Sequence, residues 1–249
     1  MRLGYSLIAV LAVVSANCTS KSERVSDPPV ERGAVFVLGG IHQQHERARL
    51  YTYQRVGDVY SHLRPDVLCV EAQQQYLDDK SDRGIPRDFT TEMLPRARRD
   101  GIPIVGIDWW DDVRGKEWEE LQGRAASDPS LQAGVKLLGT MFDSLNDYFA
   151  EVDFREANSP AIVSIWSGKT ALKERIARSR PEYAPIAEFE AERNRRMADA
   201  VATTAARHPK ARVLVAVGFD HKPYLDKELP RRGLRVVDVD EAVGSWWRP

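Results

Sequence analysis

The sequence contains only two cysteines among 249 residues, which is too few for a disulfide framework. Cys69 lies inside an apolar run, Asp66-Val-Leu-Cys-Val70, so we expect an ordinary buried core residue there. The sequence also lacks an excess of positive charge, because 36 Lys and Arg residues are balanced by 37 Asp and Glu residues. Domains that bind nucleic acid carry a basic excess, so this balance argues against a nucleic-acid partner.

The sequence has no obvious apolar run long enough to span a membrane. Its N-terminal apolar stretch, Ser6 to Ser15, follows Arg2 and is followed by small residues up to Cys18. This stretch is too short for a spanning helix but is typical of an export signal. We therefore predict a signal peptide over residues 1–18 and a location in the periplasm or cell envelope.

Cys18 is a candidate for lipidation. The preceding residues, Val14-Ser-Ala-Asn17, resemble a bacterial lipoprotein cleavage box, although Asn17 stands where a smaller residue is usual. Lipidation, which would anchor the protein to a membrane, and simple cleavage with secretion both fit the apolar length. The polar residues 19–32 are predicted to form a flexible tether.

The remaining residues, 33–249, are sufficient for one α/β domain with a sizeable core. Apolar runs and helical spacings alternate in the first part of this region, which is typical of parallel crossover units. We therefore predict a central, mostly parallel sheet flanked by helices. The predicted strands are residues 34–39, 66–70, 102–107, 212–217 and 234–239, and the predicted helices include 44–63, 91–99 and 181–206.

A second helical region interrupts the alternation. Apolar residues recur at helical spacing between Val135 and Val152. Because residues 117–180 are too many for one crossover, we predict a helical insertion or cap there, which could shape access of the substrate.

Polar side chains follow three of the predicted strands. His42 comes just after Gly39-Gly40, which we interpret as a sharp backbone turn, and Glu71 and His221 follow two later strands. Ligands of open α/β sheets bind beyond the carboxyl ends of the strands. If these strands are parallel neighbours, the three side chains converge on one edge, although polar strand ends can also arise by coincidence.

These residue types suit the activation of water. A half-buried carboxylate tends to have a raised pKa, which would suit Glu71 as a general base or as a metal ligand. His42, Glu71 and His221 fit chemistry with or without a divalent metal. His45 is a further candidate for substrate binding, or else a polar residue in a first helical turn. Together with His42 it lacks the spacing of the helical zinc-protease motif.

Two further charged residues are candidates for substrate binding. Arg193 lies on the apolar face of the predicted helix 181–206 and therefore needs an anionic or hydrogen-bonding partner. That partner could be an ion pair that ties the helix to the sheet, or an anion in the site. Asp108 follows the strand 102–107 and could face the site or cap the next turn.

The sequence resembles the superfamily that includes the TraB/GumN proteins, the Tiki proteins, the erythromycin esterases and the ChaN-type lipoproteins. The resemblance covers about residues 33–240. It implies an α/β fold with a hydrolytic site on the strand edge, in which Arg193 holds a substrate carboxylate or a developing oxyanion. The motifs that carry it are Gly39-Gly-Ile-His42, Pro65-Asp-Val-Leu-Cys-Val-Glu71, Glu192-Arg-Asn194 and Gly218-Phe-Asp-His221.

The branches of this superfamily imply different chemistries. In the esterase branch, histidine and glutamate activate water without a metal, whereas Tiki-like members hold a divalent metal and cleave peptides. The ChaN-type members are similar to haem-binding lipoproteins. Asp220 stands where a small residue is common in the family, so it could be an added ligand, an orienter of His221 or the mark of a changed activity.

We therefore expect an exported hydrolase of ester, lactone or peptide bonds, acting on a small molecule or a peptide. Glu71 and His42 would deprotonate water, His221 would complete the site and Arg193 would hold negative charge. The alternative is a non-enzymatic haem- or ligand-binding lipoprotein of the ChaN type. A third hypothesis is a degenerate member with a structural role in the envelope.

Overall fold

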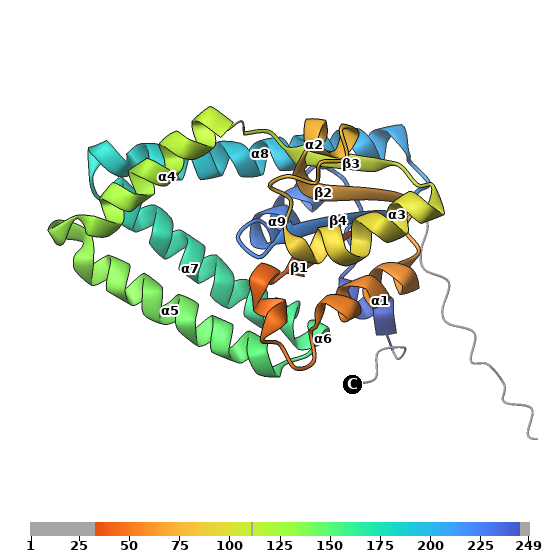
Figure 1. Ribbon diagram of the computed structural model, residues 1–249, viewed down its shortest axis with the longest axis horizontal. Helices are drawn as coiled ribbons and strands as arrows, with labels where there is room; N and C mark the ends of the chain where they lie inside the picture. Colours follow the sequence, from red (N-terminus) through yellow and green to blue (C-terminus); the bar gives the residue numbers. More distant parts are fainter. Residues whose placement is uncertain (1–32, 111, 245–249) are drawn as a thin grey trace, which may run out of the picture.

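The computed structural model describes residues 33–110 and 112–244 (Figure 1). The predicted signal peptide, Cys18 and the tether lie outside the described residues. Four parallel strands form one sheet in the order β1-β4-β2-β3, which confirms the predicted α/β fold. The strands are β1 (Val35–Gly40), β2 (Val67–Gln73), β3 (Ile104–Asp108) and β4 (Val213–Gly218).

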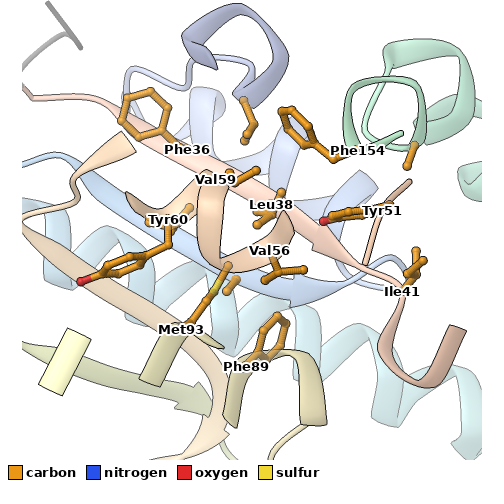
Figure 2. Close-up of a cluster of buried hydrophobic side chains, with 14 of the residues drawn as sticks. Phe36, Leu38, Ile41, Tyr51, Val56, Val59, Tyr60, Phe89, Met93 and Phe154 are labelled. Atoms are coloured by element: carbon orange, nitrogen blue, oxygen red, sulfur yellow. The ribbon is translucent and has the colours of Figure 1, made fainter. Parts of the chain in front are cut away.

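Helices cover both faces of the sheet. This explains why the strands are almost continuously apolar, since neither face is exposed to water. One face packs against helices from the first third of the chain and against two short later helices, and Figure 2 shows part of this core. The elements of this layer are α1 (Tyr53–Leu63), η2 (Phe89–Met93), α3 (Leu94–Asp100), α6 (Phe154–Ala157) and α10 (Val239–Val243).

The opposite face packs against α8 (Ala184–Arg207) and α9 (Lys222–Arg231). Val35, Val37 and Cys69 point to this side, while Phe36 and Leu38 point to the other, as the alternation of strand side chains requires. Cys69 is fully buried, as the sequence predicts. Burial also raises the pKa of its thiol to about 12, so Cys69 is an inert core residue.

The chain that connects β3 to β4 forms a group of helices that extends beyond the sheet (Figure 1). Residues 117–180, where the sequence predicts helices, lie in this group. α7 packs against both α5 and α8, so the extension is joined to the layer that covers the sheet. The elements are α4 (Asp112–Ser127), η3 (Pro129–Leu131), α5 (Gln132–Glu151), α7 (Pro160–Arg178) and η4 (Pro181–Tyr183).

The predicted helix 44–63 is in fact two elements. Residues His42–Glu46 form a 3-10 turn, η1, and α1 begins only at Tyr53. Thr52 sets this start, because its side chain accepts a hydrogen bond from the backbone N–H of Arg55. Arg64, in the left-handed conformation before Pro65, ends the helix. A short helix, α2 (Gln74–Asp78), also follows β2.

The predicted final strand, 234–239, is wrong. Only Val236 forms a bridge, with Val35 at the edge of the sheet. The next acceptor on that edge, the carbonyl of Val37, accepts a hydrogen bond from the buried ammonium of Lys222 at 2.8 Å. The chain then enters α10. In the described part of the chain, no helix has the length and apolar character needed to cross a bilayer.

Candidate active site

The structure brings His42, Glu71 and His221 together at the carboxyl end of the sheet. β4 lies between β1 and β2, with Gly40 level with Gly218, so the three residues come from neighbouring strand ends. The Nε2 atom of His221 lies 3.4 Å from Oε1 of Glu71. The juxtaposition expected from the sequence is therefore present.

Gly218 permits this close approach. A Cβ atom built on it would lie 2.4 Å from Nε2 of His42 and 3.3 Å from Oε2 of Glu71. Gly40 has a similar role, because its Cβ would lie 2.3 Å from Oδ2 of Asp88. The interpretation of Gly39-Gly40 as a sharp turn is wrong, since both residues belong to β1 and neither has a positive φ. At Gly40 and Gly218, space for neighbouring functional groups explains the missing side chain.

His42 is held by Asp88. Its backbone has a φ of 49°, a conformation that is unusual outside glycine and that occurs at functional sites. Nδ1 lies 3.2 Å from Oδ1 of Asp88, and the His42 backbone N–H donates to Oδ2 of the same carboxylate. Burial alone would lower the pKa of His42. The hydrogen bond and charge of Asp88, with the charges of Glu71 and Asp220, outweigh burial and raise that pKa to about 9.

Asp88 is a site residue that sequence reasoning missed. It is fully buried, and its only sequence signal is an acid directly before the buried Phe89. Burial would raise its pKa, but hydrogen bonds and charges from His42 and His45 lower it to about 2. His45, a predicted substrate-binding residue, lies behind Asp88, with its Nε2 3.4 Å from Oδ2 and its Nδ1 2.6 Å from the carbonyl of Tyr51. It therefore supports Asp88 and does not line the cavity.

The surroundings of Glu71 favour its charged form. Its Oε1 accepts a hydrogen bond from Nη2 of Arg193 at 2.8 Å, and its Oε2 accepts one from the backbone N–H of Gly218 at 2.6 Å. Burial would raise its pKa, but His221, Arg193 and His42 hold it well below the ordinary value. The expected raised pKa is thus contradicted, and Glu71 is poorly suited to be the base.

Arg193 forms a buried ion pair with two carboxylates. Besides Glu71, it contacts Asp108, with Nη2 2.5 Å from Oδ2 and Nε 3.0 Å from Oδ1. Burial would lower the pKa of Arg193, but the charges of Glu71 and Asp108 raise it. The ion pair ties α8 to β2 and β3. This agrees with the first of the two interpretations of Arg193 from the sequence, an ion pair between the helix and the sheet. Asp108 also accepts from the backbone N–H of Trp109 and from the indole of Trp110.

The third nitrogen of Arg193, Nη1, takes no part in the ion pair with Glu71 and Asp108. Among the described residues, no acceptor for its Nη1 group is found, while Nε and Nη2 are fully engaged. Arg193 also lines the cavity next to His42. It therefore retains donors for a ligand in addition to its structural role.

His221 is held by a residue adjacent to Arg193. Its Nδ1 lies 2.7 Å from Oδ1 of Asn194, which is buried. Asn194 therefore belongs to the site, together with its neighbour Arg193 on the same helix. α8 lies across the strand ends, so the short Asn194 reaches β4 while the long Arg193 extends towards β2 and β3.

Asp220 joins the cap helices to the site. Its Oδ1 accepts hydrogen bonds from the indole of Trp166 at 2.7 Å and from the ammonium of Lys169 at 2.6 Å. Burial would raise the pKa of Asp220, but Lys169 and Lys173 lower it to about 2. This aspartate therefore anchors α7 to the loop after β4, and its carboxylate is directed to α7 and not to the ring of His221.

A cavity of about 240 Å³ lies over these groups. Its polar side contains His42, Glu71, Arg193, Asp220 and His221. The other side is an aromatic wall, whose rings pack within 5.0 to 6.3 Å of one another. The aromatic wall consists of Phe142, Phe149, Trp166 and Phe219.

The donor set fits a divalent metal poorly. Within residues 33–110 and 112–244, no three His, Cys, Asp or Glu side chains are grouped as metal ligands. Both oxygens of Glu71 are engaged, one by the guanidinium of Arg193 and one by a backbone N–H. A divalent ion on Glu71 would therefore lie beside a fixed positive charge, which repels it.

Comparisons of the chain with models of protein families, with curated proteins and with solved structures found no match. Inferences about function therefore depend on the geometry of the site and on the chemistry of its residues.

Proposed function

We propose that this protein is a hydrolase that uses the pair His42–Asp88 as a general base to activate water for attack on an acyl carbon. The observation that carries the proposal is the pairing of these two side chains. The imidazole of His42 is about one-third exposed and lines the cavity, and the carboxylate of Asp88 behind it is fully buried. Such a carboxylate fixes the tautomer and orientation of the imidazole and stabilises the imidazolium that forms. The motifs that resemble the TraB/GumN and Tiki superfamily surround the same cavity.

In the reactive form, Nδ1–H of His42 donates to Asp88 and Nε2 carries a free lone pair. Nε2 takes a proton from water as the water oxygen bonds to the acyl carbon. The protonated Nε2 then returns that proton to the leaving oxygen or nitrogen as its bond to the acyl carbon breaks. The products are a carboxylic acid and an alcohol or amine, so the step needs no further reactant.

The other residues assist this chemistry by their charges. The Nη1 group of Arg193 can donate to the oxyanion that develops on the acyl oxygen. Asp108 and Glu71 hold the guanidinium in place, so it does not reorganise during the reaction. Glu71 also stabilises the imidazolium of His42, to whose raised pKa it contributes. His221 lies beside Oε1 of Glu71, the oxygen that Arg193 also contacts.

The haem-binding alternative receives less support. Sites for drug-sized ligands usually have volumes of about 300–1,000 Å³, so this cavity of about 240 Å³ suits a small acyl group better than the larger haem. Glu71→Ala separates the two hypotheses, because it removes turnover in a hydrolase and leaves haem binding by other ligands unchanged.

The direct test measures hydrolysis of p-nitrophenyl esters and p-nitroanilides of small acyl groups between pH 7 and pH 10. His42→Gln should lower kcat/KM by about 10²- to 10⁴-fold, the usual contribution of a general base. His208→Gln, at the end of α8 and outside the cavity, is the matched control. Full activity in His42→Gln, or no turnover by the natural protein at any of these pH values, would refute the proposal.

A further inference from the structure

Two carboxamide side chains face the cavity without protein partners. Asn146 of α5 is only 8% exposed, and in the part of the chain that the structure describes no group hydrogen bonds to its side chain. Gln44 of η1 also lines the cavity, and its Oε1 atom is buried with no donor in reach. Neither residue belongs to the catalytic groups described above.

Other buried carboxamides of this protein are satisfied. Asn158 accepts from the backbone N–H of Gly39 at 2.8 Å and donates to the carbonyl of Phe154. Asn194 contacts His221. Since buried polar atoms nearly always have partners, the buried Oε1 of Gln44 indicates a hydrogen bond that a ligand supplies, and the carboxamide of Asn146 on the same cavity wall can supply a second contact.

We infer that Gln44 and Asn146 recognise a secondary amide, so that the protein acts on amides in preference to esters. This inference rests on the proposed function. A carboxamide offers one acceptor oxygen and two N–H donors, and in Gln44 it is the acceptor oxygen that is buried. A ligand group that pairs with both the oxygen and the N–H of a carboxamide must carry an N–H and a carbonyl, as an amide does. An ester or lactone offers acceptors only and leaves the buried oxygen of Gln44 unsatisfied.

The position of the two residues places this recognition beside the reacting group. Gln44 follows His42 by two residues in the same short turn, and α5 packs against that turn. An amide held there has its carbonyl carbon next to the imidazole of His42. The aromatic wall lies on the other side of the cavity, so the acyl part of the ligand should be compact and aromatic or branched.

The experiment compares N-methylbenzamide with methyl benzoate, which differ only in N–H against oxygen, by calorimetric titration. The natural protein should bind the amide at least about 10-fold more tightly, because the ester leaves a buried acceptor unpaired. Gln44→Met and Asn146→Leu should each bring the two affinities to within about 3-fold. Gln54→Met, on the exposed side of α1, should keep the full preference.

Each variant must keep the near-ultraviolet circular dichroism and the melting temperature of the natural protein. If Asn146→Leu does not fold, Gln44→Met alone tests the inference. Equal affinities in the natural protein, no binding of either ligand, or an unchanged preference in Gln44→Met would overturn the inference. Turnover of matched p-nitroanilides and p-nitrophenyl esters separates the two proposals. Selective amide binding without turnover refutes the hydrolase alone, whereas turnover without selective binding refutes the amide preference alone.

Discussion

The carboxylate of Asp88 contacts both the ring and the backbone of His42, at 3.2 Å and 3.3 Å. The two residues are 46 positions apart, and each lies at the start of a helical segment, η1 or η2. The double contact fixes the backbone of His42 in its left-handed conformation and its ring towards the cavity. Asp88 thus controls both the position and the charge of the proposed base.

Asp88→Asn should move the pH dependence of activity. Removing the negative charge leaves burial opposed only by the charges of Glu71 and Asp220, so the pKa of His42 should fall from about 9 towards its ordinary value of 6.5. We expect kcat/KM of the natural protein to rise with pH, with a midpoint near pH 9 and a plateau above it. In the variant the midpoint should fall below pH 7, with a plateau at least about 100-fold lower, because the ring loses its fixed tautomer.

Kinetics and an NMR titration of the His42 ring measure the same midpoint independently. Asp79→Asn, on an exposed turn, provides the control. An unchanged midpoint in Asp88→Asn would show that Asp88 does not set the charge of His42.

Folding stability should also depend on pH through this pair. The folded-state pKa of His42 is raised, so its contribution is present in full below pH 6.5 and is lost as pH rises through about 9. The pKa of Asp88 is lowered, so its contribution is present above pH 3.8 and is lost as pH falls through about 2. Urea unfolding measures the free energy of unfolding at pH 6 and at pH 10. The loss between these pH values should be smaller in His42→Gln than in the natural protein, by up to about 2 kcal/mol, because the ring is partly exposed.

Glu71→Gln should destabilise the protein strongly. It keeps the size of the side chain but removes the charge that faces Arg193 and His221, leaving a buried guanidinium with Asp108 alone. Breaking a buried ion pair costs about 3–5 kcal/mol, whereas an exposed pair contributes about 0–1 kcal/mol. Glu174→Gln, which breaks the exposed pair with Arg178 on α7, is the matched control for urea unfolding. Equal losses in the two variants would contradict the structural role of Glu71.

The sequence predicted the meeting of His42, Glu71 and His221 because parallel strands place their carboxyl ends at one edge, a rule that needs only strand boundaries. It could not predict Asp88, which reaches the site only through tertiary packing. The predicted rise in the pKa of Glu71 is wrong for a similar reason, because tertiary contacts decide that pKa. Burial was visible in the sequence, but the contacts with Arg193 and the Gly218 N–H were not.

Removal of metal ions should leave activity unchanged. Arg193 already neutralises Glu71, and the proposed chemistry uses only the side chains of this chain. We expect activity within about 2-fold after exhaustive dialysis against a chelator, with metal content measured by plasma mass spectrometry on the same sample. A loss that zinc or manganese restores would instead indicate a metal-dependent hydrolase.

Gly218→Ala should inactivate the site at small cost to the fold. The new methyl group would lie 2.4 Å from Nε2 of His42, so the ring must move away from the position that it shares with Glu71. Misplacement by about 1 Å can lower a rate 10²-fold, and we expect at least that loss in kcat/KM. The free energy of unfolding should fall by only about 1–3 kcal/mol, as in other overpacked cores.

Gly139→Ala is the matched control, because the space around its Cβ position on α5 is open. It should leave activity unchanged and raise stability by up to about 1 kcal/mol, since alanine favours a helix more than glycine does. Activity and unfolding are measured on both variants under the same conditions. If Gly218→Ala kept full activity, His42 could not be working from the position beside Gly218, and the assignment of its Nε2 as the base would fail.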